Sequence, residues 1–117
     1  MKSYTDLEQS KKLTEILPLE SADMAYYFMK DSGHLVNPTP FVLDGTEEDG
    51  MFTYLNCWSL AALLGVLDFP SLTQINENEW EVCIFDHDND GYIEKIASNP
   101  IDACYEMILK LHELKML

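Results

Sequence analysis

The chain has 117 residues, of which 47% are hydrophobic and 11% aromatic, and this composition predicts one folded domain over residues 1–117. It carries 21 acidic residues against 7 basic ones, all of them lysine, for a formal net charge of −14. Nucleic-acid binding and attachment to anionic membranes both require clustered positive charge, so this balance argues against both functions. A solvated acidic surface accounts for the charge, and the functional alternative is a nucleic-acid mimic or a ligand of a basic protein.

The cysteines Cys57, Cys83 and Cys104 are odd in number and widely spaced, without a CxxC pair. The sequence therefore indicates neither a disulfide framework nor a zinc site. It has no signal-peptide pattern, and its longest apolar run is too short to cross a bilayer. We expect a cytoplasmic protein with reduced thiols, without a metal or a cofactor.

The N-terminal segment predicts a helix from Asp6 to Leu17. Thr5 and Glu8 have the spacing of a capping box with Thr5 as the N-cap, and Pro18 ends the helix.

Residues 19–31 fit either a strand or a short helix, and their tyrosine and phenylalanine content favours a strand from Ala25. A turn is expected at residues 37–40, with residues 41–43 extended after it. Tyr26, Tyr27, Phe28 and Phe41 are expected to form a local aromatic group.

The segment from Asp44 to Gly50 contains four acidic residues and two glycines and is predicted to be a loop. Its carboxylates lack the alternating ligand pattern of a hard-metal site, so a solvated loop is favoured over a metal or partner site.

The stretch from Cys57 to Leu67, CWSLAALLGVL, is apolar and uncharged. A helix that is apolar on most sides predicts a central element that the rest of the chain surrounds. A thiol at the start of a helix gains thiolate character, so Cys57 followed by Trp58 also raises the hypothesis of a cysteine-dependent hydrolase. Papain-like proteases have such a pair, but this chain lacks their flanking glycine-rich motif, and no pattern selects His34, His87 or His112 as the partner. A buried, inert Cys57 is the favoured interpretation.

The C-terminal half predicts strands at residues 71–75, 80–85 and 92–97, joined as two hairpins in a meander, with Trp80, Val82 and Ile84 on one face. Asp86, Asp88 and Asp90, followed by Gly91, match the first half of an EF-hand calcium loop. The twelfth position is Ala97 instead of glutamate and the flanks are strands, so a hairpin turn is favoured and weak calcium binding is the alternative.

The last segment predicts a helix capped by Asn99, with Pro100 at its first position and an apolar stripe that lies on the hairpin sheet. The fold class is therefore α+β. We expect one antiparallel meander sheet of about four or five strands, packed with a buried central helix and a C-terminal helix, plus an N-terminal helix.

Three blocks, LEQSKKLTEILPLESADM, CWSLAALLGVL and NPIDACYEMILKLHELKML, carry a resemblance. They are similar to small uncharacterised proteins of gut Bacteroides-type bacteria and of their phages or mobile elements. No activity, cofactor or catalytic residue comes with this resemblance. It implies an accessory protein of a mobile element, and hence host or phage interaction in place of metabolism.

We therefore expect a non-enzymatic interaction protein whose partner is a protein, neither nucleic acid nor membrane, with homo-oligomerisation left open. The candidate partner surface consists of acidic residues in two loops: Asp44, Glu47, Glu48, Asp49, Asp86, Asp88 and Asp90.

Overall fold

The computed structural model describes residues 1–44 and 50–117. Its elements in chain order are α1 (Leu7–Ile16), the 3-10 turn η1 (Leu19–Ser21), β1 (Met24–Met29), β2 (Phe41–Val42), β3 (Phe52–Cys57), α2 (Leu60–Val66), β4 (Ser71–Asn76), β5 (Glu79–Asp86), β6 (Gly91–Ala97) and α3 (Pro100–Glu113). This arrangement is α+β, as predicted, and the predicted strand after Ala25 and the extended segment after residue 40 are both present.

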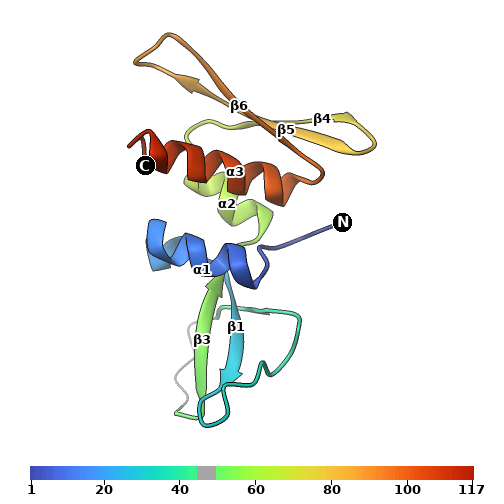
Figure 1. Ribbon diagram of the computed structural model, residues 1–117, viewed down its shortest axis with the longest axis vertical. Helices are drawn as coiled ribbons and strands as arrows, with labels where there is room; N and C mark the ends of the chain where they lie inside the picture. The colour runs from blue at the N-terminus through green and yellow to red at the C-terminus, as the bar shows by residue number, and fades with distance from the viewer. Residues whose placement is uncertain (45–49) are drawn as a thin grey trace.

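The strands form two separate antiparallel sheets instead of the single meander that the sequence predicts. The N-terminal sheet has the order β2-β1-β3 and the C-terminal sheet the order β4-β5-β6. Figure 1 shows the two sheets at opposite ends of the molecule, with the three helices between them. The chain leaves the first sheet at the end of β3, passes through Trp58 and α2, and re-enters extended structure at β4.

The molecule is elongated, with extents of 50 × 31 × 22 Å. Its radius of gyration of 15.5 Å exceeds the value of about 13 Å expected for a compact chain of this length. An elongated shape leaves more sheet surface facing solvent than a two-layer domain would.

The capping box of α1 is shifted by one residue from the predicted one. Asp6 is the N-cap, its carboxylate accepts from the Gln9 backbone N–H at 2.8 Å, and the Gln9 side chain accepts from the Asp6 N–H. Thr5, the predicted cap, is fully buried, because its hydroxyl lies in the interior against Ser10. The helix ends at Ile16, one residue before the predicted end, and Leu17 is its C-cap directly before Pro18.

The apolar stretch at residues 57–67 is only partly the surrounded helix that the sequence predicts. Cys57 ends β3, and Ser59 caps the helix by accepting from the Ala62 N–H at 3.2 Å, so α2 has seven residues. Leu63 alone is buried within α2, while Ala61 and Gly65, four residues apart, face solvent. Because alanine and glycine have little apolar surface, their exposure costs little free energy, and the helix is covered on one side only.

The C-terminal sheet and α3 agree with the sequence in detail. Asn99 accepts from the Asp102 N–H at 2.9 Å and Pro100 begins the helix. α3 packs against β5 and β6, where Val82 and Ile84 are buried. A hydrophobic core joins α1, α2, α3 and β5, and it includes the following residues: Leu13, Leu17, Trp58, Leu63, Leu67, Val82, Ile84, Ile101, Ala103, Cys104, Met107, Ile108 and Leu111.

No helix in residues 1–44 or 50–117 is long and apolar enough to span a membrane.

Candidate functional site

The predicted acidic partner residues do not form one surface. Asp44 follows β2 of the N-terminal sheet, whereas Asp86, Asp88 and Asp90 lie at the β5–β6 turn of the C-terminal sheet. Glu47, Glu48 and Asp49 lie outside the residues that the structure describes. The two sheets occupy opposite ends of the molecule (Figure 1), so among the described residues Asp44 lies apart from the three turn residues.

Asp86 holds the turn and is not a surface residue. Its side chain is 6% exposed and accepts from the Asn89 side-chain amide at 2.7 Å and from the Asp88 backbone N–H at 3.0 Å. These hydrogen bonds, the one from Asn89 first, lower the pKa of the Asp86 carboxyl below its usual value. Asp90 adopts a left-handed backbone conformation with φ +52°, which aspartate tolerates in turns.

Asp88 and Asp90 are therefore the carboxylates that the turn presents to solvent. The predicted hairpin between the last two strands is confirmed, with Asp86 opposite Gly91 at its end. Among the described residues, no group of three or more histidine, cysteine or acidic side chains is placed to hold a metal ion.

Cys57 is fully buried and lies at the end of β3, three residues before α2 begins. Its sulfur donates to the Thr5 carbonyl at 3.4 Å and accepts from the Thr5 hydroxyl at 3.6 Å. Burial raises the pKa of the Cys57 thiol, although the hydrogen bond from Thr5 acts in the opposite direction. His34, His87 and His112 are all exposed, so the structure does not bring any of them to the buried thiol. This is the environment of a protonated, structural cysteine.

The predicted aromatic group is divided between the two faces of the N-terminal sheet. The Tyr27 ring stacks on Phe41, with centroids 4.8 Å apart, and meets the edge of Tyr54 at 4.6 Å. Tyr26 points the other way, is 3% exposed, and donates its hydroxyl to the Thr5 carbonyl at 2.8 Å. Neighbouring strand residues face opposite sides, so adjacent aromatic letters do not make one patch.

The side of the C-terminal sheet that faces away from α3, here called the outer face, was not predicted as a site. Residues 82 and 84 point toward α3, so the alternate residues of β5 point outward. Pairing across β5 and β6 places Glu81 opposite Ile96, Cys83 opposite Glu94 and Phe85 opposite Tyr92. Tyr92 is 70% and Ile96 50% exposed.

The outer face is acidic as well as apolar. Desolvation raises the pKa of the Cys83 thiol, and the charges of Glu94, opposite it on β6, and of Glu81, two residues earlier on β5, raise it further. Lys95, the one lysine of the three strands, is paired with Val82 and therefore lies on the α3 side. The Phe85 ring contacts Tyr92 and His87 edge-on, at 5.2 and 4.8 Å between centroids, so the aromatic surface extends to the turn.

Phe69, in the connection between α2 and β4, is the most exposed of the large hydrophobic side chains described, at 93%. Its φ of +48° lies in the left-handed region, which costs a residue with a side chain about 1 kcal/mol. Two residues later Ser71 pairs with Cys83 of the outer face. Its neighbour Asp68 lines, together with Asp88, Ile84 and Leu111, a hollow of about 430 Å³ on the α3 side of the sheet beside the β5–β6 turn. An aromatic ring that is exposed to solvent on a left-handed backbone is a candidate contact residue.

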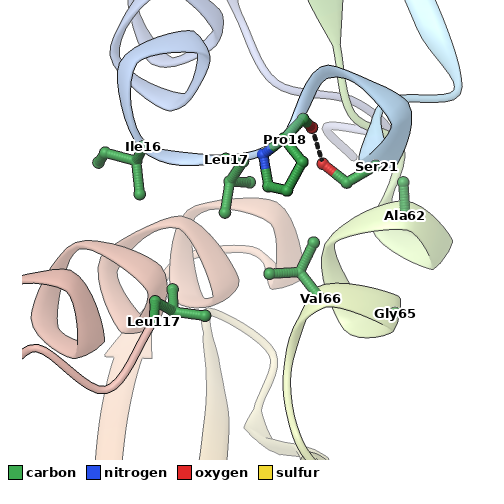
Figure 2. A pocket seen from close by; sticks show the side chains of 8 residues that line it. All are labelled: Ile16, Leu17, Pro18, Ser21, Ala62, Gly65, Val66 and Leu117. Atoms are coloured by element: carbon green, nitrogen blue, oxygen red, sulfur yellow. Dashed lines mark hydrogen bonds between the residues drawn. The ribbon is translucent and has the colours of Figure 1, made fainter.

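An apolar groove of about 520 Å³ lies between the end of α1 and α2 (Figure 2). Its lining residues are Ile16, Leu17, Pro18, Ser21, Ala62, Gly65, Val66 and Leu117. The hydroxyl of Ser21 is its one polar side-chain group, and it already donates to the Pro18 carbonyl at 2.6 Å and accepts from the Trp58 indole at 2.9 Å. The groove therefore offers a ligand apolar contact and no open polar partner.

Sequence reasoning missed the outer face because β6 mixes apolar and charged residues on both of its sides. Tyr92, Glu94 and Ile96 alternate with Ile93, Lys95 and Ala97, so periodicity alone does not say which set faces the core. The buried face of β5, combined with the hairpin register, would have assigned Tyr92, Glu94 and Ile96 to the outer face.

Comparison of the chain with protein-family models, with curated proteins and with solved structures finds no match in any of the three. The outer face, Phe69 and the exposed residues of the β5–β6 turn are therefore the basis for a functional assignment.

Proposed function

We propose that this protein is a non-enzymatic, acidic interaction protein of a phage or other mobile element, and that it binds and blocks a basic host or phage protein. The observation that carries the proposal is the outer face of the C-terminal sheet. There, exposed Tyr92 and Ile96 lie next to the carboxylates of Glu81 and Glu94, and the sheet's one lysine is on the other side. An apolar contact surface beside charges of one sign is typical of transient interfaces. The apolar contact supplies affinity, and the charge steers the partner toward the surface.

The net charge of this protein indicates that the proposed partner is basic. A net charge of −14 repels acidic partners and nucleic acids at low ionic strength and attracts basic proteins. Because the Debye length is about 10 Å at 0.1 M salt, association is expected to weaken as salt is raised, whereas apolar contact through Tyr92 and Ile96 persists.

The test is affinity capture from a lysate of a Bacteroides-type gut bacterium at low and moderate salt, followed by native mass spectrometry of the purified pair. Wild type is compared with a Glu81→Lys/Glu94→Lys variant of the outer face. The matched control is Glu15→Lys/Glu20→Lys, which makes the same change in net charge at exposed positions of α1 and η1.

We expect a protein of high isoelectric point to be retained by wild type and by the control but not by the outer-face variant, and to form a complex of discrete mass. If the two variants retain the same proteins, the outer face is not the binding surface. If wild type retains no basic protein at either salt concentration, the proposed function is wrong.

A further inference from the structure

The backbone edge of β6 is open. β6 is the last strand in the order β4-β5-β6, and it pairs over residues 91–97 with β5 on one side only. Within residues 1–44 and 50–117, no backbone hydrogen bond joins residues 91–97 to any segment other than β5. In an antiparallel edge strand every second residue directs its N–H and C=O away from the sheet, so β6 presents a row of unpaired groups.

This edge is also regular. The β5–β6 register continues without a shift from Trp80 opposite Ala97 to Asp86 opposite Gly91. The other edge strand, β4, has a register shift between Gln74 and Asn76. A bulge of that kind hinders the addition of a strand, whereas seven residues in one register form a template for it.

We propose that an extended segment of the basic partner adds as a strand to the free edge of β6. This proposal rests on the proposed function and specifies how that partner binds. Main-chain hydrogen bonds to the edge would supply affinity, and the side chains beside β6 would supply specificity.

The charges of β6 define the segment that fits. Glu94 lies on the outer face at the middle of the strand, so an incoming strand gains from lysine or arginine on that side. Lys95 lies on the α3 side and disfavours a cation there. The segment therefore alternates basic side chains on the outer face with uncharged side chains on the α3 side.

A second copy of this chain does not fit the edge as well. Two molecules of net charge −14 repel each other. An antiparallel β6–β6 pair centred at Glu94 would also place the two Glu94 carboxylates directly opposite each other, an arrangement that destabilises a strand pair. Charge thus selects a basic partner segment over self-association.

The test uses two blocked synthetic heptapeptides of identical composition as probes. In one, lysine and valine alternate, and in the other the lysines precede the valines. Binding to the full chain is measured by isothermal titration calorimetry, and amide hydrogen exchange is measured by NMR. Glu94→Lys is compared with Glu20→Lys, which makes the same charge change at an exposed position of η1.

The alternating peptide is expected to bind about tenfold more tightly than the block peptide and to slow exchange of alternate amides within residues 91–97. Glu94→Lys should weaken its binding about tenfold and Glu20→Lys much less.

Equal binding of both peptides without new protection in β6 would overturn strand addition while leaving the charged outer face as the binding surface. New protection in β4 in place of β6 also overturns the proposal. If neither peptide binds, strand addition is rejected, and the affinity capture above decides separately whether the proposed function fails with it.

Discussion

At the scale of single residues, Thr5 joins three distant parts of the chain. Its hydroxyl lies 2.8 Å from the Ser10 hydroxyl and accepts from the Trp58 N–H at 3.1 Å. Its backbone N–H donates to the Trp58 carbonyl at 3.0 Å, and its carbonyl accepts from the Tyr26 hydroxyl at 2.8 Å. The residue is fully buried, so these bonds fix where α1 meets both β1 and the end of β3.

Thr5→Val is therefore expected to destabilise the protein although it preserves size and shape. The variant leaves the buried Trp58 N–H without an acceptor, which costs about 1–3 kcal/mol. Thr5→Ser is the control, because it keeps the hydroxyl and loses one methyl group, worth about 0.8 kcal/mol. Urea unfolding measures both free energies. A valine variant as stable as the serine variant would show that the hydroxyl is not needed.

The cysteines are expected to differ in reactivity according to exposure. Cys57 and Cys104 are fully buried, and burial raises the pKa of the Cys104 thiol to about 11. Cys83 is half-buried on the outer face, although desolvation and its acidic neighbours raise its pKa too. In native protein at neutral pH, iodoacetamide should label Cys83 first, and Cys83→Ser should abolish the fastest phase, as measured by intact mass. Faster labelling of Cys57 than of a model thiol would support the hydrolase hypothesis.

At the scale of elements, the β5–β6 turn separates structural from exposed carboxylates. Asp86→Ala removes the acceptor for Asn89 and Asp88 and is expected to lower the melting temperature by several degrees. Asp88→Ala, in the same turn and with the same change in charge, should have little effect because Asp88 is exposed.

The turn also gives a predicted pH dependence. The pKa of Asp86 is lowered in the folded state, so its contribution to stability is present above the ordinary aspartate pKa and is lost as pH falls through the lowered value. Thermal unfolding of wild type and Asp86→Ala from pH 6 downward should therefore converge in acid. A constant difference at every pH would mean that the ionised carboxylate is not what holds the turn.

At the scale of the whole molecule, net charge opposes folding. With a charge of −14, self-repulsion is strongest at low ionic strength, and added salt screens it. The melting temperature is expected to rise between about 10 mM and about 200 mM sodium chloride. The Glu15→Lys/Glu20→Lys variant, with a net charge of −14 + 4 = −10, should show a smaller rise. A melting temperature that falls with salt would mean that favourable ion pairs outweigh the repulsion.

The same charge has opposite consequences for stability and for binding. Salt should stabilise the free protein and weaken its association with a basic partner, so the two measurements together separate self-repulsion from recognition.

Local patterns in the sequence predicted the elements that depend on local chemistry. The helix from Pro100 followed from its asparagine cap and N1 proline, and the β5–β6 hairpin followed from alternation around an Asp/Asn/Gly turn. The N-cap of α1 was displaced by one residue because Thr5 and Asp6 are both good caps. Burial of Thr5 against Ser10 decided between them, and no local pattern contains that information.

The sequence alone determined that this is an acidic α+β chain with helices at both ends, since charge, caps and periodicity are properties of neighbouring residues. Only the tertiary structure decided that the strands form two sheets, that α2 is half exposed, and that Tyr92, Glu94 and Ile96 face solvent. The physical reason is that burial depends on which elements cover a surface. α3 covers one face of the C-terminal sheet, so the other face, with its carboxylates, remains exposed to solvent.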